Sequence, residues 1–191
     1  ENIDMSVQKG EHPRIGAVDV CPFVPLSGIS MDECAELAKK LAFRVSKELG
    51  ICSFLYGAAA ISPDRELLSD LRRGQYEGFR KRPEDCGPHL PDYGPLDWNE
   101  TTERFGAVVI GARNILVAYN VNVDEKDARV SRKAGSLVRS TGRLLKKEDG
   151  RKTRVPGMLD MVQGMGLPLE AQGISQVSMN LRDVNVTPMH I

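Results

Sequence analysis

The chain of 191 residues carries 26 basic and 26 acidic residues, and this balance leaves no overall electrostatic field to favour nucleic acid or an anionic membrane surface. Hydrophobic residues make up 41% of the sequence, which is typical of a soluble globular protein, and no run approaches the about 20 apolar residues of a membrane-spanning helix. The four cysteines show no metal-binding spacing. We therefore expect a cytoplasmic protein with reduced cysteines that binds no metal and no nucleic acid and has no membrane span.

The first part of the chain predicts a βαβ unit. Residues 17–24 form a short apolar run bounded by turn-forming residues, which predicts a largely buried strand. Ser30 and Glu33 have the spacing of a capping box and predict the start of a helix, and Gly50 suits its end. A second strand is predicted over residues 51–56. Because the connections are short, the two strands should be parallel and the crossover right-handed.

The later elements indicate a second α/β unit of similar composition. In chain order, the sequence predicts a short helix after Pro63, an irregular loop over 74–105, strands over 106–113 and 115–123, a helix capped by Asp124, an exposed basic loop over 143–154, and a hairpin of strands 158–169 and 174–186. A loop as long as 74–105 within a compact domain is either functional or disordered. The two α/β halves imply a cleft at their junction, where ligands commonly bind.

One stretch carries a family resemblance. Residues 10–23 read Gly-Glu-His-Pro-Arg-Ile-Gly-Ala-Val-Asp-Val-Cys-Pro-Phe and resemble, position by position, the motif of the formiminotransferase domain, a glutamate formimidoyltransferase found alone or fused to a cyclodeaminase. Residues 106–113, 119–122 and 176–181 are similar to further family segments in the expected order. Family members have additional sequence on both sides, so the chain is expected to be a fragment with a partial N-terminal subdomain (1–113) and a partial C-terminal subdomain (114–191).

The resemblance implies an activity. The family transfers the formimino group of N-formiminoglutamate to N5 of its co-substrate tetrahydrofolate, in histidine degradation and one-carbon metabolism. It also implies two small α/β subdomains of βαβ, ferredoxin-like type, with sheets that face a folate-binding cleft, together with a homo-oligomeric state and a cyclodeaminase domain as partner. The alternative is a non-catalytic folate-binding or interaction module that retains the fold.

His12 is the candidate catalytic residue. It aligns with the catalytic histidine of the family, and a side chain that titrates near neutral pH suits both proton transfers of the reaction. Pro13 restricts the backbone of His12 to extended geometry. The structural alternative is that His12 caps a loop or packs beneath Tyr56. His89 and His190 are expected to be a solvated loop residue and a structural residue, respectively.

Three further residues of the first half are candidate folate or substrate contacts. Arg14 can bind a substrate carboxylate through two hydrogen bonds, or it can pair with Glu11 or Asp19 to hold the motif. Asp19 within an apolar strand needs a partner, so it is either structural or an orienting group in the cleft. Tyr56 matches a family tyrosine near the reacting centre, and its alternative role is that of a core tyrosine.

The remaining candidates lie in one loop and one strand. Residues 94–106 correspond to the folate-binding loop of the family, although only their ends match, and Trp98 or Phe105 could stack on an aromatic ring of the ligand. The expected folate contacts of this loop are Gly94, Pro95, Leu96, Asp97, Trp98, Arg104, Phe105 and Gly106. Asn120 and Asn122 point to one face of a strand, either as a polar groove wall that binds the pterin or substrate, or as amides that are satisfied at a strand edge or in a hairpin. The basic residues of 146–154 are a solvated loop or bind a polyglutamate tail.

Overall fold

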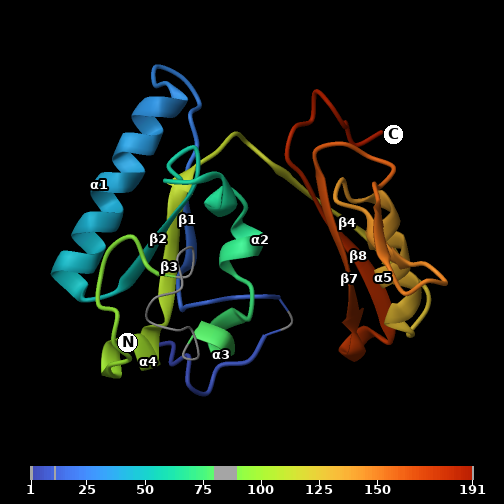
Figure 1. Cartoon of the computed structure of the whole chain (residues 1–191), viewed down its shortest axis with the longest axis horizontal. Helices are drawn as coiled ribbons and strands as arrows, with labels where there is room; N and C mark the ends of the chain where they lie inside the picture. Colours follow the sequence, from blue (N-terminus) through green and yellow to red (C-terminus); the bar gives the residue numbers. More distant parts are fainter. Residues whose placement is uncertain (1, 11, 80–89, 191) are drawn as a thin grey trace. The chain divides into compact units, whose positions relative to one another are not determined.

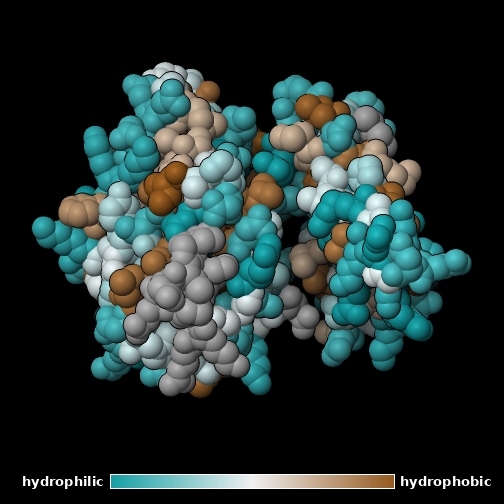
Figure 2. All heavy atoms as spheres, viewed as in Figure 1, coloured by the Kyte–Doolittle hydropathy of each residue, from teal (hydrophilic) through white to brown (hydrophobic). Residues whose placement is uncertain are grey.

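The structure is a computed structural model that describes residues 2–10, 12–79 and 90–190. It divides into two compact units, unit 1 over residues 1–113 and unit 2 from residue 114 onward, and each unit combines helices with small β-sheets. The predicted α/β class is therefore confirmed. None of the helices within the described ranges has the length and apolar character required to cross a bilayer. On the face seen in Figure 2, hydrophobic residues form separate small groups among hydrophilic ones.

Unit 1 is built on a three-stranded parallel sheet. Its elements are β1 (Asp19–Phe23), α1 (Met31–Leu49), β2 (Cys52–Gly57), η1 (Pro63–Arg65), α2 (Leu68–Leu71), α3 (Gln75–Phe79), α4 (Glu100–Phe105) and β3 (Ala107–Ala112). The strand order is β1-β3-β2, so β3 lies between the two strands that flank α1. The predicted capping box of α1 is present, with Ser30 and Glu33 exchanging hydrogen bonds, and the helix ends at Gly50 in a left-handed conformation with φ 67°.

Side chains cover both faces of this sheet. On one face α1 packs its small residues, Cys34, Ala35, Ala38 and Ala42, against β2 and β3. On the other face Ile15 and residues of α2 and α3 pack with Phe54, Tyr56 and Val109. Helices α2 and α3 lie on the side of the sheet away from α1 (Figure 1). The sheet of unit 1 is thus covered on both faces, which is usual for parallel strands. The edge strand β1 is half-buried along its length rather than largely buried.

Unit 2 contains an antiparallel sheet with one helix against it. Its elements are β4 (Val117–Val123), α5 (Ala128–Val138), β5 (Arg143–Lys146), β6 (Lys152–Val155), β7 (Val162–Leu169), η3 (Glu170–Gln172) and β8 (Ile174–Leu181). The order β4-β8-β7 places β4 at an edge, and the hairpin predicted between β7 and β8 is confirmed. Helix α5 packs on β7 and β8.

Three local predictions were wrong. The exposed basic loop 143–154 is a hairpin of β5 and β6, whose turn ends at Gly150 with φ 81°, a conformation that glycine adopts readily. The cap of α5 is Asp127, which accepts a hydrogen bond from the Arg129 amide, because a turn at 123–125 comes between Asp124 and the helix. Within the predicted irregular loop, α4 forms because the Asn99 side chain accepts a hydrogen bond from the Thr102 amide.

Candidate active site on the loop before β1

His12 lies on the loop that leads into β1, and its side chain is exposed. Within the described part of the chain, His12 takes part in no hydrogen bond or ion pair. An exposed imidazole does not have the packed position that a role beneath Tyr56 would require, and it is accessible to a ligand. His190 is also exposed, whereas His89, together with Glu11 and Cys86, lies outside the described residues.

The backbone that follows His12 is anchored to the core of unit 1. Ile15 is fully buried. Its amide donates to the Asp19 carboxylate at 2.8 Å, and its carbonyl accepts from the Ala107 amide at 2.9 Å. The Ala17 amide donates to the Phe105 carbonyl at 2.8 Å. The loop is therefore fixed at the N-terminal edge of the sheet, where β1 and β3 begin.

Gly106, one of the predicted folate contacts, has a packing role in this anchor. It pairs with Gly16 where the loop crosses the start of β3. A Cβ atom at position 106 would lie 2.2 Å from the Ile15 carbonyl oxygen and 2.8 Å from the Gly16 Cα atom. Gly106 also has φ 76°, a region that favours glycine. Only glycine therefore allows the two segments to approach this closely.

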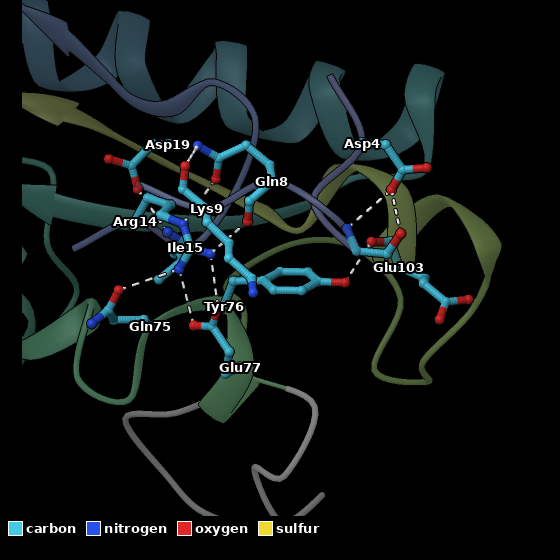
Figure 3. A network of polar contacts seen from close by, with 11 residues as sticks. Asp4, Gln8, Lys9, Arg14, Ile15, Asp19, Gln75, Tyr76, Glu77 and Glu103 are labelled. Carbon is cyan, nitrogen blue, oxygen red and sulfur yellow. Dashed lines mark hydrogen bonds and ion pairs between the residues drawn. The ribbon is translucent and has the colours of Figure 1, made fainter. Parts of the chain in front are cut away.

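Arg14 is occupied by other protein groups (Figure 3). A guanidinium has five N–H donors, one on Nε and two on each terminal nitrogen. Arg14 Nε donates to Gln8 Oε1 (3.0 Å). Nη1 donates to Gln75 Oε1 (3.2 Å) and to Glu77 Oε2 (2.9 Å). Nη2 donates to the Gln8 carbonyl (3.0 Å) and to Glu77 Oε1 (2.7 Å). These bonds use every donor, so Arg14 holds the motif in this structure, with Glu77 as its partner. Hydrogen bonding by Arg14 lowers the pKa of Glu77 below its ordinary value, and Glu77 in turn raises the pKa of Arg14.

Asp19 also has a protein partner. One of its carboxylate oxygens accepts from the Ile15 amide, and the other forms an ion pair with the Arg72 guanidinium. Asp19 has φ 64°, which is uncommon for a residue other than glycine. These contacts support the structural role that the sequence left open for Asp19.

The start of segment 94–106 is tied to the edge of β2. Ser53 and Tyr93 form an isolated antiparallel bridge beside the strand. Arg65 and Asp92 form a buried ion pair at 2.8 Å, and the same Asp92 oxygen accepts from the Leu55 amide at 2.7 Å. The Pro95 carbonyl accepts from the Cys52 thiol, whose pKa is raised by burial.

The aromatic residues of this segment pack on the protein. Trp98 lies with its ring centroid 5.7 Å from that of Tyr76 and 5.8 Å from that of Phe79, and Phe105 packs against the core beneath α1. Ring stacking on a ligand would therefore require these side chains to leave their present contacts. Among the folate contacts predicted for this segment, Leu96, Asp97 and Arg104 have exposed side chains, Gly94 is exposed and Pro95 is half-buried.

Tyr56 is separated from the loop anchor along the sheet. It is only 4% exposed, and its ring lies over Gly111, where a Cβ atom would be 2.5 Å from the ring. Its hydroxyl is buried and makes no hydrogen bond of good geometry with the described residues. Burial raises its pKa, and the nearby Arg113 guanidinium opposes part of this rise. Cys52 of β2 lies opposite Ala107 of β3, where the loop is anchored. Tyr56 comes four residues later in β2, which corresponds to about 13 Å along the strand. This position agrees with a core tyrosine.

Asn120 and Asn122 lie on the face of the unit 2 sheet opposite α5. Asn122 Oδ1 accepts from the Gln176 side chain at 2.8 Å, and Asn120 Oδ1 accepts from the Met179 amide at 3.3 Å. By strand register, four more polar residues share this face, Gln163 of β7 and Gln176, Ser178 and Asn180 of β8. The structure therefore contains a strip of amide side chains in unit 2. No group of three or more potential metal ligands occurs within the described ranges.

Sequence reasoning missed Arg72, Gln75 and Glu77, which hold Asp19 and Arg14. They belong to a stretch that the sequence marks only as charged and glycine-containing. No local pattern indicates their contacts, because each partner lies more than 50 residues away in the chain.

Comparison with known proteins gives one family. The family profile described as the formiminotransferase domain, N-terminal subdomain, matches residues 1–113. The profile described as the formiminotransferase domain matches residues 118–191. Together the two profiles account for nearly all of the chain.

Curated relatives are similar over almost the whole chain. A formimidoyltransferase-cyclodeaminase of Mus musculus is 42% identical over 98% of this chain and 32% of its own length. Glutamate formimidoyltransferases of Streptococcus pyogenes and Thermoplasma acidophilum are 40% and 38% identical, over 95% and 100% of this chain and 54% and 57% of their own lengths. The chain thus spans between about a third and somewhat more than half of these relatives.

Proposed function

Because the chain belongs to the formiminotransferase domain family, we propose that it is the transferase part of a glutamate formimidoyltransferase. It would transfer the formimino group of N-formiminoglutamate to N5 of tetrahydrofolate. The observation that carries this proposal is the exposed imidazole of His12, held on an anchored loop within the family motif. The names of the relatives from S. pyogenes and T. acidophilum support the same activity.

The proposed role of His12 is that of the acid and base. The N5 amine attacks the formimino carbon and forms a tetrahedral species. Its collapse requires one proton to leave N5 and one to reach the departing glutamate nitrogen. A histidine side chain can accept and donate a proton near neutral pH, and a positioned acid or base accelerates such steps by about 10²–10⁴-fold. The described neighbours of His12 leave its imidazole open for this exchange.

The polar strip of unit 2 suits the proposed co-substrate. The edge of a pterin ring carries both donors and acceptors, and amide side chains supply the complementary groups. Asn120 and Asn122 use their oxygens within the protein, so their amide nitrogens are the groups proposed to bind the ring. The exposed guanidinium of Arg104, which is 3.7 Å from the carboxylate of Asp4, is proposed to bind an anionic tail.

The cellular setting is also proposed from the family. The reaction belongs to histidine degradation and one-carbon metabolism, in the cytoplasm. The working form would be a homo-oligomer. A cyclodeaminase would act on the product, either fused, as the name of the mouse relative indicates for that protein, or separate.

The test is formation of 5-formiminotetrahydrofolate by the natural protein that contains this chain. His12→Ala is expected to lower kcat by about 10²–10⁴-fold and to leave folate binding intact. His190→Ala is the matched control, since His190 is also exposed. Wild-type turnover by His12→Ala would overturn the acid and base role. Folate binding without any transfer by the wild type would favour a folate-binding module.

A further inference from the structure

Two segments far apart in the sequence are joined by a pair of reciprocal ion pairs. Residues 14–19 begin with an arginine and end with an aspartate, and residues 72–77 begin with an arginine and end with a glutamate. The segments run antiparallel, so that Arg14 binds Glu77 and Asp19 binds Arg72. We call these four residues the reciprocal clamp. Between them the Tyr76 amide donates to the Arg14 carbonyl at 2.9 Å.

We propose that Arg72 and Glu77, with Gln75, are positioning residues for the transfer reaction and act by fixing the loop that carries His12. This inference rests on the proposed function of His12. The clamp begins two residues after His12, and Pro13 restricts the remaining link. A loop fixed from residue 14 onward presents the imidazole in a narrow range of positions, which is the condition for efficient proton transfer.

The exposure of Glu77 argues for a local role of the Arg14–Glu77 pair, whereas the Arg72–Asp19 pair is more buried, with 22% and 18% exposure. Glu77 is 63% exposed, whereas Arg14, which it binds through both oxygens, is 12% exposed. A carboxylate that lies mostly in water loses little solvation on pairing and gains only modest Coulomb energy, as in exposed ion pairs. Figure 3 shows the contacts between Arg14 and Glu77. We infer that this pair acts mainly on the order of the loop to which Arg14 belongs.

The backbone conformation at the clamp is a second, independent observation. Within the described ranges, three residues other than glycine have positive φ, namely Asp19 (64°), Gln75 (57°) and Met161 (55°). Two of these belong to the joined segments. Residues with a side chain rarely adopt a positive φ. They keep this backbone conformation where surrounding contacts hold it in place, which often occurs at functional sites. The contacts of Asp19 with Ile15 and Arg72, and of Gln75 with Arg14, are such contacts.

The test uses the natural protein that contains this chain and the variant Glu77→Gln. This change keeps the size of the side chain and removes its charge. We expect kcat to fall by about 10²-fold, since small misplacement of a catalytic group has an effect of that order, with KM changed less than about threefold. Glu48→Gln on α1 is the matched control, because it removes the carboxylate of an exposed Arg44–Glu48 pair. The control should leave kcat unchanged.

A second comparison separates positioning from a general structural effect. In the His12→Ala background, Glu77→Gln should lower the remaining rate less than about twofold, because there is no imidazole left to position. Hydrogen exchange of the amides of residues 14–17 should increase in Glu77→Gln alone. An equal loss of rate in both backgrounds, or unchanged exchange, would overturn the proposal. A wild type without transfer activity would overturn the proposed function and the reaction role of the clamp, while the exchange result would still report whether the clamp orders the loop.

Discussion

The buried ion pair between Arg65 and Asp92 allows a quantitative test of how segment 92–98 is held. Both side chains are almost completely buried, with 6% and 4% exposure, and the charged atoms are 2.8 Å apart. Arg65→Met removes the positive charge and keeps much of the side-chain length. The Asp92 carboxylate would then remain buried with only the Leu55 amide as a described partner. Leaving one member of a buried pair uncompensated typically lowers the free energy of unfolding by about 3–5 kcal/mol.

Removing both charges should be less harmful than removing one. In the double variant Arg65→Met/Asp92→Asn, the asparagine oxygen can still accept from the Leu55 amide. Its free energy of unfolding should therefore lie within about 1–2 kcal/mol of the wild type. The exposed pair of Arg104 and Asp4, whose charged atoms are 3.7 Å apart, provides the control. Arg104→Met should change the free energy of unfolding by less than about 1 kcal/mol.

The measurement is urea unfolding followed by the fluorescence of Trp98, the single tryptophan of the chain. Trp98 lies in the segment that the ion pair holds and packs on Tyr76 and Phe79, so its signal reports the unfolding of unit 1. If Arg65→Met costs no more than Arg104→Met, the burial argument is refuted. A double variant less stable than Arg65→Met would refute the assignment of the loss to an unpaired carboxylate.

Three other predictions follow from the same contacts. Gly106→Ala should lower the free energy of unfolding by about 4 kcal/mol or more, because its Cβ atom would overlap the Ile15 carbonyl; Gly173→Ala, with φ 70° but open space around it, should cost only about 1–2 kcal/mol. Iodoacetamide followed by peptide mapping should modify the half-buried Cys21 at least about 10-fold faster than Cys52, whose pKa is raised by burial; equal rates would contradict the buried position of Cys52. Because Arg14 lowers the pKa of Glu77 below its ordinary value of 4.5, the pair stabilises the fold fully above that pH and loses its contribution as the pH falls through the lower folded value. The stability difference between wild type and Glu77→Gln, less than about 1 kcal/mol by urea unfolding, should therefore shrink below pH 4.5 and not above it.

Elements with local signals could be predicted from the sequence. The capping box at Ser30 and the glycine at position 50 depend on residues within one turn of the helix ends, and both are found as expected. The hairpin of β7 and β8 depends on a short turn between two β-prone runs. In contrast, β5 and β6 were missed because their strands are short and charged, and the single useful signal was the Asp149-Gly150 turn.

Contacts between distant segments could not be predicted in this way. Glu77 and Arg14 are 63 residues apart, and Arg72 and Asp19 are 53 residues apart. The sequence offered Glu11 and Asp19 as partners of Arg14 because they are near it in the chain, whereas the structure supplies a carboxylate from α3. The side-chain positions of Trp98 and Phe105 likewise depend on tertiary packing, so their aromatic character alone could not distinguish a core residue from a stacking platform.

The structure shows which residues of the family motif have a structural role. Among the described residues of the motif, Arg14 and Asp19 hold segment 72–77, Ile15 enters the core, and Gly16 permits the crossing with Gly106. Each of these residue types is therefore explained by the fold. His12 differs from them, because its side chain is exposed and takes part in no hydrogen bond or ion pair among the described residues. The role that we propose for His12 is chemical. Replacing it should therefore affect turnover and leave the free energy of unfolding nearly unchanged.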